Sequence, residues 1–421
     1  MTMVMTMVVI NSDCSRNFCL LASTRGLFYR PFERMGLETM TDLPDILGME
    51  VQQDPAVFIR ALQLGADLQH YGRFDPPFYI VHRYGDVERV LREPDTFISG
   101  RGQGPTFTAP AGVVSDPPDH TFYRRLVQDA FQPAAIAALE PRLVEIAGEA
   151  LASVDLNKEW DLHDTLAFPL PIRIICEILG IPTSDIWQFK QWSDISVAAL
   201  ASGNPAAFAD QVQQLSTYVL ALLREKRRAP DDTLMSRIAL GQRDGLPIPD
   251  SEAVSLTSQM FVAGNETTTS LITNFVWRMC RFNLWEDFAE DRIDLELAIN
   301  ESLRFDPPLL ALFRTTAREV SIGGTRIPAG AKVMTHYGAA NRDPTCFEEP
   351  HRFIPERRGP RALSFGLGIH SCLGKELARL EARVALQALR AHCPGLRLVN
   401  DGVRIPPFLF WGRCKLPVRN T

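Results

Sequence analysis

A glycine-rich stretch that leads into a cysteine is the feature that most constrains the fold of this chain. Residues 365–374 read FGLGIHSCLG, and a strongly amphipathic helical pattern begins at once with Lys375. Gly366 and Gly368 allow the backbone to turn tightly and to approach a flat ligand closely. Because Cys372 comes just before a helix, backbone N–H groups and the positive end of the helix dipole can stabilise its thiolate. The alternative is a structural cysteine buried in a glycine-rich turn.

The composition is that of an ordinary globular protein. Of the 421 residues, 46% are hydrophobic and 22% are charged, which supplies enough apolar material for a large core and an internal cofactor cavity. The net charge of −6 argues against a nucleic-acid partner. The eight cysteines form no C-x-x-C pair, so we expect reduced thiols without a disulfide framework.

The N-terminus carries a short apolar run, MTMVMTMVVI, without a basic region before it. It is too short for a membrane span, which takes about 20 apolar residues. We expect residues 1–45 to be a poorly ordered leader and residues 46–421 to form one domain. The most apolar long stretch of that domain carries Asn265 and Glu266 at its centre, so we expect no membrane segment there either.

Helical periodicity dominates the rest of the chain. Helices are predicted over residues 54–71, 84–92, 250–282, 293–305 and 375–392, and repeatedly between Pro117 and Arg228. Strands are predicted over residues 76–81, 320–334 and 408–418, with a Gly323-Gly324 turn in the second of these segments. Residues 99–115 are rich in Gly, Pro, Ser and Thr and predict a long functional loop. The pattern indicates a mainly α fold with small peripheral β-sheets.

The longest helical segment contains a break in good helix design. Ala263 and Gly264 precede the acidic Glu266 and the hydroxyl-bearing Thr267. Gly and Thr lower helix propensity, and a carboxylate and a hydroxyl are costly in an apolar interior. Local violations of this kind are expected where function requires them. The alternative is an exposed polar helix face with a glycine kink.

The cysteine stretch resembles the haem-binding signature of the cytochrome P450 family at every fixed position, Phe365, Gly366, Gly368, His370, Cys372 and Gly374. The resemblance extends from about Asp54 to Val418, with the motifs in the family's order. It implies a single helical domain of the triangular-prism type that binds haem b, with Cys372 as the axial ligand of the iron. A thiolate ligand favours cleavage of the O–O bond of dioxygen.

The resemblance also assigns roles on the long helix. Ala263 and Gly264 would form a groove for O₂, Thr267 would hydrogen-bond dioxygen, and Glu266 would relay protons through water. Because this acid–alcohol pair is intact, the resemblance implies a monooxygenase. Two rival classes remain: a haem-thiolate isomerase or peroxygenase, and a haem sensor without catalysis.

The same resemblance assigns roles to two sets of charged residues. Glu301 and Arg304 share one face of a helix, which by itself is weak evidence, since surface pairs at this spacing are common. In the family the pair is buried and binds a further arginine, here Arg357, in a structural role. His120 and Arg124 also share a helix face, where a solvated surface is the simpler reading. The family's donors to the haem propionates match His120, Arg124, Arg314 and His370.

A hydrophobic substrate, such as a terpenoid, steroid, fatty acid or aromatic compound, is suggested by the residues expected around the pocket. These are Phe107, Phe261, Val262, Ala263, Leu309, Leu310, Leu312, Phe408 and Leu409. Each of them could equally be part of the plain hydrophobic core.

Basic residues cluster in sequence around the cysteine loop, namely Arg125, Arg357, Arg358, Arg361, Lys375 and Arg379. Solvated surface charge is the usual meaning of such a cluster. In bacterial-type members of the family this face docks an acidic ferredoxin, which charge steering would favour. We therefore expect a cytoplasmic monomer that receives electrons from a separate ferredoxin and its reductase.

Overall fold

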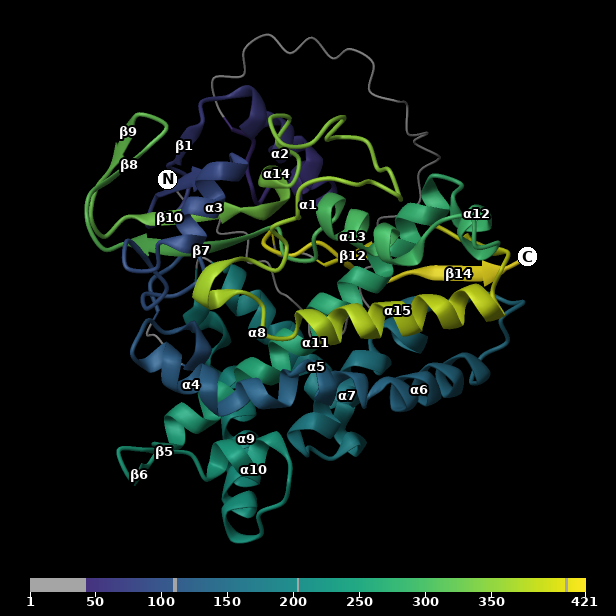
Figure 1. The fold of residues 1–421 in the computed structure, drawn as a ribbon, viewed down its shortest axis with the longest axis horizontal. Coiled ribbons are helices and arrows are strands. Elements are labelled where there is room, and N and C mark those ends of the chain that lie inside the picture. Colours follow the sequence, from purple (N-terminus) through teal and green to yellow (C-terminus); the bar gives the residue numbers. More distant parts are fainter. Residues whose placement is uncertain (1–42, 109–111, 203, 406–407) are drawn as a thin grey trace, which may run out of the picture. The chain divides into compact units, whose positions relative to one another are not determined.

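The structure is a computed structural model, and it describes residues 43–108, 112–202, 204–405 and 408–421 (Figure 1). Residues Asp42–Thr421 form one compact unit. Nearly all of the predicted leader, residues 1–42, lies outside the described residues. Within the described ranges, every helix is too short or too polar to cross a membrane.

Helices make up most of this unit. They are α1 (Met49–Gln53), α2 (Pro55–Leu64), α3 (Tyr84–Arg92), α4 (Asp119–Val127), α5 (Pro133–Ala137), α6 (Glu140–Ala152), α7 (Pro169–Leu179), α8 (Ile186–Ala201), α9 (Ala209–Arg228), α10 (Leu234–Ala239), α11 (Asp250–Arg281), α12 (Trp285–Ala289), α13 (Leu295–Phe305), α14 (Tyr337–Ala340) and α15 (Lys375–His392). The mainly α architecture agrees with the prediction, and the bounds of α3 and α15 match it residue for residue.

The strands form small sheets at the edge of the helical part. They are β1 (Leu68–Tyr71), β2 (Phe78–Val81), β3 (Phe97–Ile98), β4 (Trp160–Asp161), β5 (Gln242–Arg243), β6 (Leu246–Pro247), β7 (Ala311–Thr316), β8 (Val320–Ile322), β9 (Thr325–Ile327), β10 (Lys332–His336), β11 (Leu396–Leu398), β12 (Val403–Arg404), β13 (Arg413–Lys415) and β14 (Pro417–Asn420). The largest sheet has the order β1-β2-β10-β7-β3, and in it β10 pairs antiparallel with β7 and parallel with β2.

The predicted helix over residues 54–71 is wrong in its second half. Asp54 caps α2 through a bond from the Ala56 N–H, as expected, but the helix ends at Leu64 and Gly65 follows. Residues 68–71 then form β1 and pair antiparallel with β2. Pairing of residues 68–71 with β2 outweighed the helical pattern, and Gly65 ended the helix.

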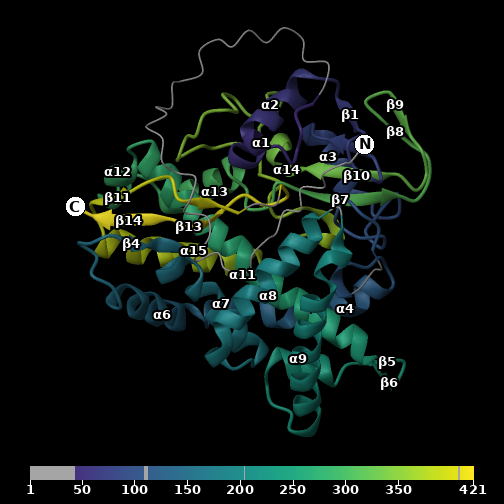
Figure 2. The ribbon, with the colours of Figure 1, turned by 180° about the vertical axis from the view of Figure 1, so that it is seen from behind.

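Helix α11 runs through the interior and connects the core to the site. Acidic Asp250 and Glu252 lie in its first turn and Arg278 and Arg281 in its last, which complements the helix dipole. Its C-terminal half contributes buried residues such as Phe275 to a core cluster shared with α6, α7, α13 and α15. Helices α6 and α15 lie side by side in both views (Figures 1 and 2), and α15 also packs on α11. The cysteine loop is thereby held against the middle of the molecule.

Candidate active site

Backbone hydrogen bonds fix the loop before Cys372. The Cys372 N–H donates to the Phe365 carbonyl over 2.8 Å, and the Gly366 N–H donates to Leu363 over the same distance. Gly366 and Gly368 have φ of 63° and 70°, in the left-handed region that favours glycine. A Cβ at Gly368 would lie 2.4 Å from the Leu91 carbonyl oxygen. The loop therefore requires glycine at residue 368 for two independent reasons.

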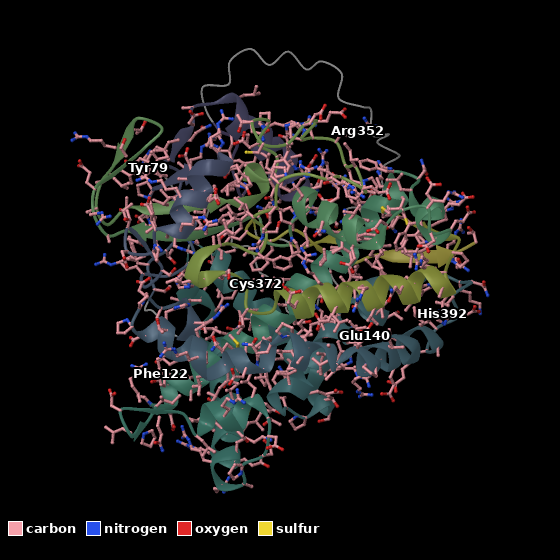
Figure 3. All side chains as sticks on the ribbon, viewed as in Figure 1. Tyr79, Phe122, Glu140, Arg352, Cys372 and His392 are labelled. Carbon is pink, nitrogen blue, oxygen red and sulfur yellow. The ribbon has the colours of Figure 1, made fainter. Side chains whose placement is uncertain are left out.

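Cys372 lies in the loop that leads into α15 (Figure 3). The side chain of Cys372 keeps solvent-accessible surface, but many protein atoms surround it. This burial raises the pKa of the thiol. The Gly374 N–H and the charges of Arg124 and Lys375 act in the opposite direction. The predicted thiolate-favouring groups are thus present, but burial outweighs them. A bound metal deprotonates a thiol outright, so the loop contributes mainly the position of the sulfur.

Four basic side chains converge on the same region from three elements. His120 and Arg124 come from α4, Arg314 from β7, and His370 from the short helical turn Gly368–His370. The imidazole rings of His120 and His370 lie 4.5 Å apart in an edge-to-face arrangement. Burial, followed by the charges of Arg314 and His120, lowers the pKa of His370 to about 3. Burial and Arg124 lower the pKa of His120 as well.

The protein satisfies the polar atoms of this basic cluster only in part: Arg314 donates to the Phe313 carbonyl over 2.8 Å. Among the described residues, the Nε2 atoms of both His120 and His370 are buried without a hydrogen-bond partner. Burial lowers the pKa of Arg124, and the Cys372 sulfur, once ionised, acts in the opposite direction. Basic groups that repel one another and keep free donors fit an anionic ligand. A haem, with two propionates and an iron that accepts a thiolate, fits both the cluster and Cys372.

A second basic cluster, Glu301–Arg304–Arg357, is complete in itself. The Arg304 Nε donates to Glu301 Oε2 over 2.7 Å, and the Arg357 Nε lies 3.1 Å from the same oxygen. The Ile354 N–H donates to Glu301 Oε1, and the remaining guanidinium donors of Arg304 reach backbone carbonyls, including that of Asn341. The structure thus brings together the three residues that the sequence grouped.

In the middle of α11, Ala263 and Thr267 keep accessible surface among largely buried neighbours. Ala263 is exposed although it lies in the middle of the helix, and the half-buried Thr267 donates its hydroxyl to the Ala263 carbonyl over 3.0 Å. Gly264 faces elsewhere: a Cβ there would meet the Ile175 side chain of α7 at 3.2 Å. This glycine thus permits close packing of α11 on α7, and the role of Gly264 in a groove for O₂ stays a prediction.

Similarity to known proteins decides the family. The cytochrome P450 family profile matches residues 293–392. The erythromycin C-12 hydroxylase of Saccharopolyspora erythraea is 38% identical over 355 residues, which cover 80% of this chain and 88% of the relative. The chain belongs to the cytochrome P450 family. It is accordingly a haem-dependent monooxygenase with iron protoporphyrin IX as cofactor.

Other P450s agree in sequence and fold. The vitamin D(3) 25-hydroxylase of Pseudonocardia autotrophica is 35% identical over 395 residues, 90% of this chain and 97% of the relative. A mutant of P450 EryK in complex with erythromycin B superposes with a TM-score of 0.81 at 34% identity, covering 88% of this chain and 97% of that one. CYP109E1 from Bacillus megaterium in complex with testosterone gives 0.80 at 31% identity, covering 88% and 99%. These structures confirm the predicted fold class.

Charged neighbours of Glu266 form a network that sequence reasoning missed. Glu266 is buried, and burial followed by the charge of Asp194 raises the pKa of its carboxyl, whereas Lys190 and His163 lower it. Lys190 binds Asp194 over 3.1 Å within α8, and the buried His163 ring contacts Asp164 over 2.7 Å. The i, i+4 spacing of Lys190 and Asp194 was visible in the sequence, but their place beside Glu266 depends on how α8 crosses α11.

Glu381 of α15 is a second buried carboxyl that sequence reasoning missed. Both of its oxygens lack a hydrogen bond of normal geometry, although the Thr268 hydroxyl of α11 lies close enough to lower its pKa. Burial dominates and raises the pKa to about 8. Within α15 this residue looks like one more charged position, and the sequence offers no signal that it is buried.

The residues expected around the substrate pocket fall into two groups. Phe261 and Leu409 are fully buried in separate core clusters, so the plain-core alternative describes them. Leu310 and Phe408 are also buried and border a small void of about 10 Å³. The others keep accessible surface: Phe107 is 46% exposed, and Val262, Leu309 and Leu312 are half-buried.

The basic residues around the cysteine loop are partly exposed. Arg125, Arg358 and Arg361 are exposed, and Lys375 and Arg379 are half-buried. Arg379 lies over the Phe365 ring at 5.4 Å. Arg125 borders an open hollow of about 840 Å³ that Phe122 (Figure 3) and Leu126 also line. In the described part of the chain, positive charge is therefore available near the start of α15 and on α4.

Proposed function

We propose that this P450 hydroxylates an unactivated C–H bond of a small hydrophobic molecule with electrons from a separate ferredoxin. One oxygen atom of O₂ enters the substrate and the other leaves as water, which takes two electrons and two protons. The observation that carries the proposal is the convergence of His120, Arg124, Arg314 and His370 on the region of Cys372. Haem bound there supplies the activation of O₂.

The residues of the chain have separate roles in this proposal. Cys372 ligates the iron within the loop of Phe365, Gly366, Gly368 and Gly374, and the four basic residues bind the propionates. Thr267 would hydrogen-bond dioxygen; its hydroxyl proton is donated to the Ala263 carbonyl in this structure, so the hydroxyl has to turn away from that carbonyl in order to donate to dioxygen. Glu266 relays protons: burial and the charge of Asp194 raise the pKa of its carboxyl, which favours the proton-bearing form, and the Lys190–Asp194 pair of α8 acts on it electrostatically.

The proposed substrate class rests on the apolar side chains that keep accessible surface near the site. Val262, Leu309, Leu312 and the exposed Phe107 offer shape and few polar groups. Relatives are named for hydroxylation of erythromycin and vitamin D3, and a similar structure holds testosterone. A large polycyclic or macrocyclic lipophile is consistent with these names, and terpenoids, fatty acids and aromatic compounds complete the screen.

The proposed electron donor is an acidic ferredoxin that docks on a cytoplasmic monomer. Arg125, Arg358, Arg361, Lys375 and Arg379 offer positive charge near the cysteine loop in a chain that is acidic as a whole. Complementary charge accelerates such encounters and makes them sensitive to salt. Reduction by a ferredoxin that slows steeply with ionic strength is the expected behaviour.

The haem-thiolate assignment is tested by Cys372→Ser. The reduced wild-type protein with carbon monoxide should give the Soret band from which the family takes its name, and the variant should lose it. Thr267→Ala should then keep that band but divert most reducing equivalents to peroxide instead of product. Thr273→Ala, which removes a buried hydroxyl bonded to Ser270 on the same helix, is the matched control. Full product yield in Thr267→Ala would favour a peroxygenase or isomerase.

A further inference from the structure

A buried lysine holds the loop that precedes α4. Lys332, at the start of β10, is 1% exposed. Its ammonium donates to the backbone carbonyls of Arg101, Gly102 and Gly104 at 3.0, 2.9 and 3.1 Å. An ammonium has three N–H donors and no acceptor, so these three carbonyls satisfy it completely.

The charges around Lys332 make this arrangement unusual. A buried lysine is ordinarily paired with a carboxylate, but the charged neighbours that affect Lys332 are the cationic Arg314 and Arg101. Burial and these two charges lower the pKa of Lys332 to about 8. The ammonium is therefore retained at neutral pH in an unfavourable setting, and the three carbonyl dipoles are what offset the cost.

The loop is placed at the site by these contacts. The Phe313 N–H of β7 donates to the Gln103 carbonyl over 2.9 Å, beside Arg314 of the basic cluster. On its other side the loop touches α8, because a Cβ at Gly104 would lie 2.4 Å from the Leu200 carbonyl oxygen. Glycine at residue 104 thus lets the loop fit between the sheet and α8.

The same ammonium orients an aromatic side chain of the loop. The Phe107 ring centroid lies 5.0 Å from Lys332 Nζ and 6.0 Å from the guanidinium carbon of Arg101. Both distances are within the range of cation–π attraction. Phe107 nevertheless keeps 46% of its surface exposed. The two cations therefore fix the position of the ring, while its exposed surface stays available to a ligand.

We propose that Lys332 is a positioning residue for substrate binding, because its three hydrogen bonds hold residues 101–104, and with them Phe107, in the arrangement that admits a large substrate. The proposal rests on the proposed function, since it assumes that this loop borders the P450 substrate pocket. Without the ammonium, the three carbonyls lose their hydrogen-bond donor and bind water instead. Substrate binding then has to order the loop, and this cost lowers the affinity for the substrate.

The test compares Lys332→Met with Lys158→Met, which removes a lysine whose side chain is 80% exposed, in the haem-loaded enzyme. Amide hydrogen exchange over residues 99–108 should become about tenfold faster in Lys332→Met only. Titration with clotrimazole, a bulky azole that binds haem iron, should show about tenfold weaker binding. Imidazole, which is too small to need the loop, should bind equally well to all forms.

Two further variants separate the explanations. Lys332→Arg keeps the positive charge, but its planar fork cannot direct three donors at three converging carbonyls; exchange in the loop should rise here too. Protection of the loop amides restored by arginine would overturn the three-carbonyl account.

If Lys332→Met fails to retain haem, Lys332→Gln replaces it in the same measurements. Unchanged exchange and unchanged clotrimazole affinity, with the carbon monoxide band retained, would refute this inference alone, whereas absence of that band in the wild type would refute the proposed function.

Discussion

Two clusters of buried basic residues lie in this molecule and differ in how they are satisfied. In the Glu301–Arg304–Arg357 cluster the carboxylate and its two guanidinium partners are held at 2.7–3.2 Å. In the cluster of His120, Arg124, Arg314 and His370 the basic groups lie close to one another, and two imidazole nitrogens find no partner among the described residues. The first cluster is closed by the chain itself. The second fits an anion, and none of the residues that the structure describes supplies one.

Structural and functional clusters of buried charges differ in whether their partners belong to the chain. A closed cluster contributes to folding, because removal of one member leaves the others buried and unpaired. An open cluster, in which the basic groups lack partners, destabilises the folded protein until its ligand binds. Binding removes this destabilisation, so the ligand stabilises the folded state. Substitutions in the two clusters should therefore differ in whether haem changes their effect.

The largest expected effect is that of Glu301→Gln. The substitution leaves two arginines buried without a counter-charge, and it should lower the free energy of unfolding by about 3–5 kcal/mol. The loss should be similar with and without haem, as measured by denaturant melts of both forms. A loss confined to the haem-bound form would mean that the cluster belongs to the cofactor site.

Glu381→Gln tests a third state, a buried carboxyl with neither counter-charge nor proper hydrogen bonds. Its folded pKa of about 8 lies above the ordinary value of 4.5, so the folded protein binds the extra proton between these pH values. Wild-type stability attributable to Glu381 is present below about pH 4.5 and is lost as pH rises through about 8. The variant should lack this loss and be more stable than wild type at pH 8 by on the order of a few kcal/mol. Melts at pH 5 and pH 8 measure this, and a difference independent of pH would contradict it.

Arg124→Gln should separate the open cluster from the closed one. The apo-protein should be as stable as wild type or slightly more so, because a repulsive charge is removed. Haem transfer to apomyoglobin should become about tenfold faster, which corresponds to a loss of about 1.4 kcal/mol of binding free energy. The neighbouring Arg125→Gln is the control and should leave haem transfer unchanged. Equal loss of stability in the apo and holo forms would place Arg124 with the closed cluster.

The smallest effect is expected for Glu349→Gln. This carboxylate pairs with Arg352 over 3.2 Å, but the two side chains are 54% and 68% exposed. Pairs of this kind contribute little because water and salt screen them. The melting temperature should change by no more than the error of the measurement at moderate salt. A clear change in melting temperature would show that the Glu349 side chain supports the nearby Glu301–Arg304–Arg357 cluster, although only the Glu349 carbonyl accepts a hydrogen bond from Arg357.

Local motifs could be predicted from the sequence because their geometry depends on neighbouring residues. The turn at Gly366 and Gly368 follows from residues that tolerate positive φ, and α15 follows from its own periodicity. Contacts between distant elements could not be predicted in this way. Lys332 is an ordinary charged residue at the start of a strand, and only the return of the 99–108 loop to β10 surrounds it with carbonyls. The close packing of Gly264 on α7 likewise depends on how two distant helices meet.

The sequence alone was enough to predict the family and the helical class of the fold, and it supplied the residues proposed for the chemistry: Cys372 in its glycine loop and the pair Glu266 and Thr267. These are encoded by residue types at short spacings, and such spacings fix local geometry. The tertiary structure alone decided which charges are closed and which are open, which carboxyls are buried, and which residue holds the loop at the site. Burial and pairing depend on the packing of elements far apart in the chain, and the cost of an unpaired polar group exists only once water has been excluded from it.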